Sequence, residues 1–215
     1  MAKLVIGTDK TVGTPAIVTV TTDGKYAIMA RVKDDNNDDI GCVVGYHTDS
    51  NNQKYAVVCL NKEYRTTSNY MWLSDNVAVS NLPNYTDASM YEAPETATFN
   101  CDKILAQATA SSLTSTAVSQ CRTLSFTIDG NTYYGQLPSI PEILYIMMHR
   151  TEINTNDPSV SGAEIVTTAS YWSSTQYDTT RALDINAGVN LSGTIALNSK
   201  YSSYRVIPIL EIPID

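Results

Sequence analysis

Apolar residues in the first part of the chain form short runs that polar residues interrupt. These runs fall at residues 4–6, 16–20 and 26–30 and are separated by glycines. Such a pattern predicts two or three short strands, too few to form a core of their own. An acidic and amide-rich run at 34–39 then breaks the pattern. We therefore expect a β-rich attachment or oligomerisation segment over residues 1–35 and a main domain over residues 36–215.

The main domain opens with a predicted β-hairpin. Two apolar stretches, 40–46 and 54–60, flank a polar turn at 48–53. Antiparallel pairing about this turn puts Cys42 opposite Cys59, because opposite residues in such a hairpin have numbers with a constant sum. That sum is 101 for the two cysteines and also for the turn ends, residues 48 and 53. We interpret the two cysteines as small buried side chains, with a disulfide as the alternative.

Helical spacing follows in three places. Residues 93–110 carry apolar side chains three and four positions apart, with Pro94 in the first turn, and a second short helix is expected over 115–123. The third helix begins after Ser139, which forms a capping box with Glu142, and ends near Arg150. Beyond it the pattern becomes strand-like again, with runs at 171–175, 181–185 and 204–210 after an earlier strand at 124–128.

Composition and charge exclude several classes of function. The chain has 215 residues, a net charge of −8 and 14 Tyr against 2 Phe and 2 Trp. The acidic balance argues against a nucleic-acid partner or an anionic membrane surface, because both require basic patches. No apolar stretch predicts a signal peptide or membrane insertion, so we expect synthesis in the cytoplasm followed by a place in a virion or at the cell surface. The abundant Tyr, Ser and Asn are typical of polar binding surfaces.

The titratable residues do not indicate an enzyme or a metal site. The acidic run at 34–39 lacks the Gly and Glu of an EF-hand loop, and we interpret it as a solvated turn. With only His47 and His149 and no Cys-x-x-Cys, a zinc site has little support. We interpret His149 as a helix-capping residue and His47 as a solvated turn residue. Because the sequence also lacks a Gly-x-Ser-x-Gly elbow and nucleotide-binding glycine loops, we expect no enzyme and no cofactor.

Three motifs in the second half carry a resemblance to a known family. They are Leu-Pro-Ser-Ile-Pro-Glu-Ile at 137–143 with Ile153 and Asn154 beyond the helix, Tyr-Trp-Ser-Ser-Thr-Gln-Tyr at 171–177, and Ser-Tyr-Arg-Val-Ile-Pro at 203–208. Together they resemble bacterial and bacteriophage proteins with a C-type-lectin-like fold. That group includes phage tail-tip proteins and the variable proteins of diversity-generating retroelements.

The resemblance implies an α+β, C-type-lectin-like fold. Two helices would pack on antiparallel sheets, a loop-rich C-terminal face would bind ligand, and a small N-terminal β segment would precede them. Trp172 would be a core residue, and Arg205 would pair with a carboxylate such as Glu142. The sequence departs from sugar-binding lectins because it lacks their calcium-binding Glu-Pro-Asn and Trp-Asn-Asp triplets. It also departs from the related formylglycine-generating enzymes, because no Cys follows Cys121.

The expected binding residues lie in polar stretches between the Tyr-Trp-Ser-Ser strand and the last strand. They are Tyr177, Asp178, Thr180, Arg181, Asn186, Asn190, Ser192, Asn198 and Tyr201. We expect a calcium-independent, phage-tail or retroelement-diversified protein that binds a cell-surface protein or glycan receptor and forms a homo-oligomer through residues 1–35. The alternative is a structural adhesin or virion assembly subunit without a specific ligand.

Overall fold

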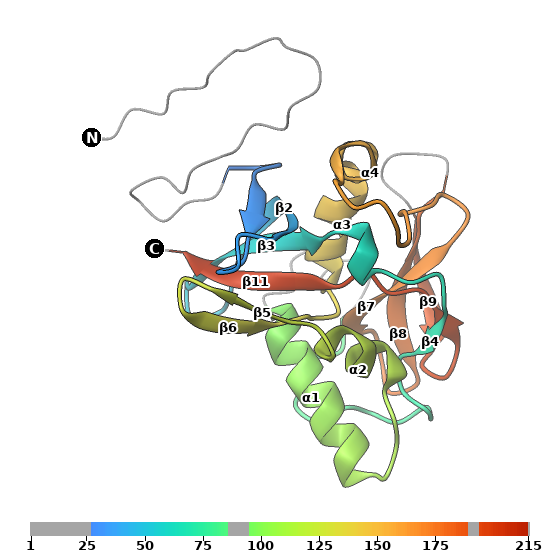
Figure 1. Cartoon of the computed structure of the whole chain (residues 1–215). Helices are drawn as coiled ribbons and strands as arrows, with labels where there is room; N and C mark the ends of the chain where they lie inside the picture. The colour runs from blue at the N-terminus through green and yellow to red at the C-terminus, as the bar shows by residue number, and fades with distance from the viewer. Residues whose placement is uncertain (1–26, 86–94, 189–193, 215) are drawn as a thin grey trace.

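A computed structural model describes residues 27–85, 95–188 and 194–214 (Figure 1). Within these ranges the chain is α+β, with four α-helices and four small antiparallel sheets. The helices are α1 (Ala97–Ala110), α2 (Thr116–Arg122), α3 (Ile140–Met148) and α4 (Arg150–Asn156), and a 3₁₀ turn, η1, spans Lys62–Tyr64. The strands are β1 (Arg31–Lys33), β2 (Asp39–Thr48), β3 (Lys54–Leu60), β4 (Tyr70–Met71), β5 (Ser125–Ile128), β6 (Asn131–Tyr134), β7 (Ser170–Gln176), β8 (Arg181–Asn186), β9 (Thr194–Ser199), β10 (Ser203–Tyr204) and β11 (Ile209–Ile214).

The largest sheet has the strand order β1-β2-β3-β11. The predicted hairpin is confirmed, because Cys42 lies directly opposite Cys59. Both thiols are buried and free, as the first interpretation of the two cysteines expected. Strand β11 completes the sheet by pairing Ile209 with Cys59 and Ile214 with Lys54.

The N-terminal segment is described only in part. Residues 1–26, including the predicted strands at 4–6 and 16–20, lie outside the described residues, so the attachment role of 1–35 stays a prediction. Strand β1 pairs with β2 in the large sheet, where Arg31 lies opposite Cys42. A deletion that tests the segment should therefore end at residue 26, because removing residues 27–35 also removes an edge strand.

Local signals place the helices close to where the sequence predicts them. Thr96 caps α1 by accepting a hydrogen bond from the Phe99 amide, and the capping box of Ser139 and Glu142 begins α3. His149 ends α3 as its C-cap, which confirms its predicted place, although α4 then continues the chain in helical form. No helix among the described residues is long and apolar enough to span a membrane.

Two tryptophans anchor the part of the core between the helices and the smaller sheets. Trp172 on β7 is fully buried, donates its indole N–H to the Tyr70 carbonyl over 2.9 Å, and packs edge-on against Tyr204. Trp72 is also fully buried and donates to the Ser173 carbonyl over 2.8 Å. The predicted core position of Trp172 is confirmed, and the two indoles connect the irregular segment around residue 72 to β7.

The sheet β7-β8-β9 contains an edge strand, β9, that the sequence does not predict. The sequence predicts polar loops between β8 and the last strand, whereas residues 194–199 form strand β9, which pairs with all of β8. Ile195 and Leu197 alternate along β9 and pack against the core, which explains why this polar stretch becomes a strand. The predicted last strand is divided into β10 and β11, on either side of residues 205–208.

Candidate functional site

The turn between β7 and β8 holds four of the predicted binding residues in one hydrogen-bonded arrangement. Asp178 accepts hydrogen bonds from the amides of Thr180 and Arg181 at 2.8 and 2.7 Å, and from the Arg181 Nε at 2.8 Å. The Arg181 guanidinium carbon lies 4.9 Å from the centre of the Tyr177 ring. Partial burial acts to raise the pKa of Asp178, but these hydrogen bonds outweigh it and lower the pKa to about 2. The turn is therefore fixed by its own side chains.

Tyr201 lies on the neighbouring turn between β9 and β10. The Lys200 amide donates to the Thr180 carbonyl over 3.2 Å, which joins the two turns, and the Tyr201 side chain is 56% exposed. We call residues 177–181 together with 199–202 the turn surface. It brings five predicted residues together: Tyr177, Asp178, Thr180, Arg181 and Tyr201.

Two further predicted binding residues, Asn186 and Asn198, lie outside this surface. Asn186 lies at the opposite end of β8, where it pairs with Thr194. Asn190 and Ser192 lie outside the described residues. Asn198 lies on β9, half-buried, and its side-chain amide donates to Asp184 over 2.6 Å. The single loop-rich face that the sequence predicts is thus divided between the two ends of the β7-β8-β9 sheet.

Beneath the turn surface lies a buried lysine, Lys200, within one of the stretches that the sequence predicts to be polar. The Lys200 ammonium donates to Gln176 Oε1, the Val77 carbonyl and the Thr179 carbonyl at 2.6, 2.7 and 3.0 Å, and lies 5.1 Å from the Trp72 ring centre. The Gln176 amide nitrogen in turn bonds to the segment at 82–84. These contacts connect three loops to one buried cation, and burial lowers the pKa of Lys200 to about 8.

We expect the buried Lys200 ammonium to make the free energy of unfolding depend on pH. Between pH 8 and 10.5 the unfolded chain holds the proton and the folded chain releases it. The contribution of Lys200 to the free energy of unfolding should therefore rise with pH, by at most about 1.4 kcal/mol per pH unit. The difference between the native protein and Lys200→Met, followed by chemical denaturation at several pH values, measures this rise.

The stability of Lys200→Met must be subtracted from that of the native protein, because the four buried thiols make the free energy of unfolding fall as the pH rises. Burial raises the pKa of Cys42 and Cys101 to about 12, so the unfolded chain loses these protons first and stability falls at high pH. Both proteins share the thiols, so their effect cancels in the difference. A difference that is independent of pH would mean that Lys200 titrates as it does in water.

A second group of titratable side chains lies inside the molecule, where β2, β11 and α3 meet. His47 Nδ1 lies 3.2 Å from Glu142 Oε1 and 4.0 Å from Glu211 Oε1. We call these three residues the buried cluster. The prediction of a solvated His47 is wrong, because His47 lies on β2 and is only 7% exposed. Glu142 pairs with His47 rather than with Arg205, whose main chain bonds to Ser170 and Trp172 instead.

The N-termini of two helices point at the buried cluster. Glu211 accepts hydrogen bonds from the first amides of α1, at Ala97 and Thr98, over 3.0 and 2.8 Å. Glu142 accepts both from the Ser139 amide and from its hydroxyl at 2.7 Å. Burial and the neighbouring Glu142 raise the pKa of Glu211, whereas hydrogen bonds from His47 and Glu211 outweigh burial and lower the pKa of Glu142. One ligand atom from each of the three residues lies within 4.8 Å of the other two, a spacing that could hold a metal ion.

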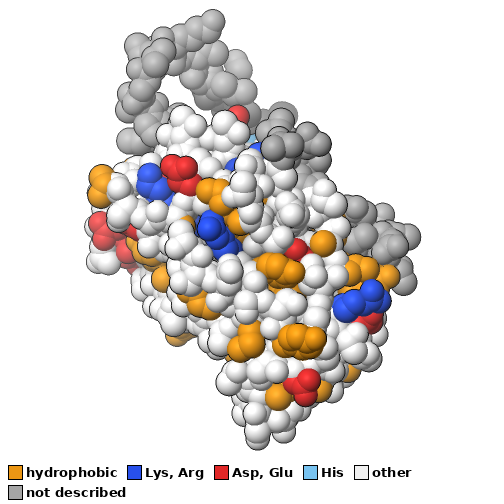
Figure 2. Space-filling view, turned by 90° about the vertical axis from the view of Figure 1, so that its right-hand side faces the viewer, with side chains coloured by type: hydrophobic (Ala, Val, Ile, Leu, Met, Phe, Trp, Pro, Cys, Tyr) orange, Lys and Arg blue, Asp and Glu red, His pale blue; other side chains and the backbone are white. Residues whose placement is uncertain are grey.

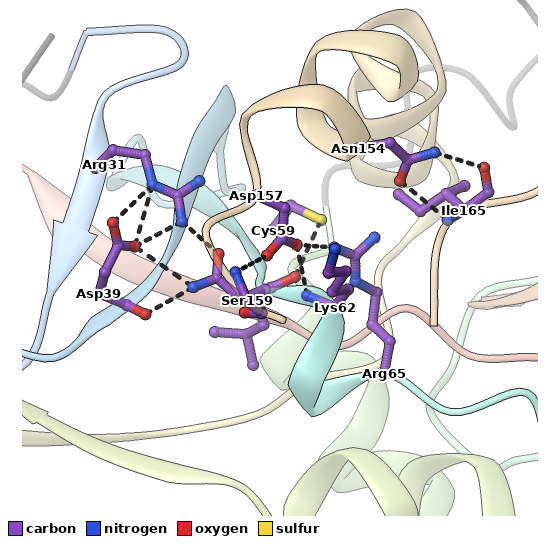
Figure 3. A network of polar contacts seen from close by, with 11 residues as sticks. Arg31, Asp39, Cys59, Lys62, Arg65, Asn154, Asp157, Ser159 and Ile165 are labelled. Atoms are coloured by element: carbon purple, nitrogen blue, oxygen red, sulfur yellow. Dashed lines mark hydrogen bonds and ion pairs between the residues drawn. The ribbon is translucent and has the colours of Figure 1, made fainter. Parts of the chain in front are cut away.

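A third polar network connects loops on the side of the large sheet (Figure 3). Asp157 accepts from the Lys62 amide at 2.6 Å and from Arg65 Nη2 at 2.5 Å, with both charged side chains almost fully buried. Arg31 pairs with Asp39 nearby, beside a shallow acidic pocket of about 390 Å³ that Asp39 and Ser159 help to line. The network joins η1 to the segment after α4.

The acidic run at 34–39 borders this network. Asp34 accepts from the amides of Asn36 and Asp38, which confirms the predicted turn.

The outer face of the molecule near β4 and β9 carries hydrophobic side chains scattered among polar ones (Figure 2). Charged side chains on this face are few and dispersed, so they form no large field of one sign. Such a face can contact a partner through shape and hydrogen bonds rather than through long-range charge attraction.

Comparisons with known proteins identify a fold but no family. No protein-family model matches the sequence, and no curated protein is significantly similar to it. A fimbrial protein from Bacteroides ovatus is similar in structure, with a TM-score of 0.57 and 14% identity over 88% of this chain. The match covers 48% of that protein, so the chain spans about half its length. The predicted resemblance to C-type-lectin-like proteins is wrong, because the solved structure that this fold resembles is that of a bacterial fimbrial protein.

Proposed function

We propose that the chain is a non-enzymatic domain of a bacterial surface protein, acting as a structural adhesin or an assembly subunit. The similarity to the fimbrial protein over 88% of the chain is the observation that carries this proposal. The contacts of the buried titratable side chains agree with a non-enzymatic role. The carboxylates and imidazole of the buried cluster already bond to one another and to helix ends, and Lys200 is enclosed by carbonyl groups and Gln176. We accordingly favour the cell surface over a virion as the location.

Labelling of intact cells tests this location. Antibodies against the purified protein are expected to label the outside of unpermeabilised cells that produce it, in projecting or clustered assemblies under electron microscopy. The signal should disappear after brief treatment of whole cells with protease, while a cytoplasmic marker protein stays intact. Label that appears only after permeabilisation would contradict a surface role.

Receptor binding through the turn surface is a second candidate function. Its support is the rigid pairing of Tyr177 with Arg181 beside the exposed Tyr201, since Tyr and Arg provide most of the energy at protein interfaces. The receptor would be a cell-surface protein or a glycan. A structural subunit has no need of such a surface, so binding measurements separate the two candidates.

We expect that the double variant Arg181→Ala, Tyr201→Ala removes binding of the purified protein to bacterial cells or to a glycan array. Each truncation should weaken binding by about 2 kcal/mol or more and leave the melting temperature nearly unchanged, because both side chains are exposed. Tyr134→Ala is the matched control, since Tyr134 on β6 is 50% exposed and lies outside the turn surface. If the native protein binds neither target, or if all variants bind alike, the turn surface is not a receptor site.

A further inference from the structure

We propose that the buried cluster of His47, Glu142 and Glu211 binds one divalent transition-metal ion such as Zn²⁺ or Mn²⁺, which cross-links β2, β11 and α3 at the N-terminus of α1. The site would be structural, because it lies in the interior and all three residues are nearly inaccessible to solvent. It is independent of the turn surface and of any receptor.

The spacing of the donor atoms fits a small metal ion. Zinc binds imidazole nitrogen and carboxylate oxygen at about 2.0–2.2 Å, so donors around a tetrahedral ion lie about 3.3–3.6 Å apart. His47 Nδ1 lies 3.2 Å from Glu142 Oε1 and 4.0 Å from Glu211 Oε1. These two distances bracket the required values, and the Glu142 and Glu211 oxygens lie within 4.8 Å of each other, so small side-chain shifts would bring all three donors to one ion. One nitrogen and two oxygens are a donor set that zinc and manganese accept.

The charge of the site also favours a cation. The Glu142 side chain is 0% exposed and that of Glu211 is 1% exposed, and the two carboxyl groups contact each other. Two buried carboxylates repel strongly unless a proton or a cation lies between them. His47 can provide at most one positive charge. A divalent ion would displace the shared proton and neutralise both carboxylates at once.

A third carboxyl group, that of Glu95, lies near the buried cluster. Glu95 directly precedes the cap of α1 and is close enough to His47 for the imidazole charge to act on it. Its Oε2 is inaccessible to water and has no hydrogen-bond partner among the described residues. A buried oxygen without a partner is costly, and a metal ion on His47 would give it a ligand position. Glu95 could thus complete the coordination as a fourth donor.

The experiment uses the full chain, freed of metal with a chelator and dialysed. Zn²⁺, Mn²⁺, Mg²⁺ and Ca²⁺ are added separately, and the melting temperature is recorded together with the binding stoichiometry from calorimetry. We expect Zn²⁺ or Mn²⁺ to bind at one ion per chain. Free metal at a hundredfold its Kd should raise the melting temperature by about 5–10 °C. Mg²⁺ should have little effect, because it favours all-oxygen sites and keeps several waters.

Two histidine variants locate the ion. His47→Gln keeps a hydrogen-bonding side chain beside Glu142 but removes the imidazole ligand, so it should lose most of the metal-induced shift. His149→Gln is the matched control, because His149 also pairs with a glutamate, Glu152, but at an exposed position. It should keep the full shift.

Three results would overturn the proposal. The first is a folded native protein that binds none of the four ions, which would leave the shared proton as the only cation in the cluster. The second is an equal shift in His47→Gln and the native protein, which would place the ion elsewhere. If His47→Gln does not fold, Glu211→Gln replaces it, because Glu211 is the second of the three proposed ligands. A metal affinity that is unchanged in Glu211→Gln would be the third result.

Discussion

Replacing Trp172 with alanine is expected to lower the free energy of unfolding by about 3–5 kcal/mol. The indole is fully buried and contacts Tyr204, and its N–H bonds to the Tyr70 carbonyl. Truncation would leave a cavity and remove the partner of that carbonyl, and the surrounding strands β4 and β10 have only two residues each to repack. Chemical denaturation followed by circular dichroism measures the loss.

Tyr201→Ala provides the comparison for this prediction. Its side chain is more than half exposed, so its removal should change stability by about 0.5 kcal/mol or less. If Trp172→Ala cost no more than Tyr201→Ala, the indole would not have the supporting role that its contacts indicate.

Asp157→Ala is expected to have an effect of similar size, about 3–5 kcal/mol. The Asp157 side chain is 1% exposed and that of its partner Arg65 is 2% exposed, so the variant would leave a buried guanidinium without an anion. Two nitrogens of Arg65 already lack hydrogen-bond partners among the described residues, so the arginine has no alternative acceptor nearby. The Lys62 amide would lose its acceptor as well. The free energy of unfolding of the purified variant checks this loss.

The exposed pair of Arg122 and Asp102 is the control. Asp102 is 63% exposed, and breaking such a pair costs about 0.2–1 kcal/mol. The double variant Arg65→Met, Asp157→Leu is a further check, because removing both charges should restore part of the stability that Asp157→Ala loses. A single and a double variant of equal stability would contradict the ion-pair explanation.

The elements that the sequence predicts correctly depend on neighbouring residues. The capping box of Ser139 and Glu142 lies within one helical turn, and the register of Cys42 with Cys59 follows from the length of one hairpin turn. The turn at Asp178 is also local, so four predicted surface residues do lie together. Such signals are readable because each involves residues only a few positions apart or on one hairpin.

The errors arise where distant parts of the chain meet. His47 resembles a turn residue because Thr48 and Asp49 follow it, but the pairing of β11 with β3 brings Glu211 to it and buries both. Lys200 stands in a polar stretch, and groups from distant parts of the chain, Val77 and Gln176 among them, enclose its ammonium group. The sequence also gives no sign that Glu142 and Glu211, both far from His47 along the chain, lie beside it in the fold. The short motifs that suggested a C-type-lectin-like protein describe local strands and a helix cap, which unrelated folds can share.

The position of β11 has a consequence for how fast the protein folds. Cys59 pairs with Ile209, so the main sheet closes a loop of 150 residues, the difference between these two numbers. Closing so long a loop slows folding, because most of the chain must be ordered before the last strand gains its contacts. The equilibrium cost rises only slowly, by about 0.6 kcal/mol for each doubling of a flexible loop. Lengthening a surface loop between β3 and β11 should therefore cost the folded state little, while a variant that weakens β11 should fold more slowly.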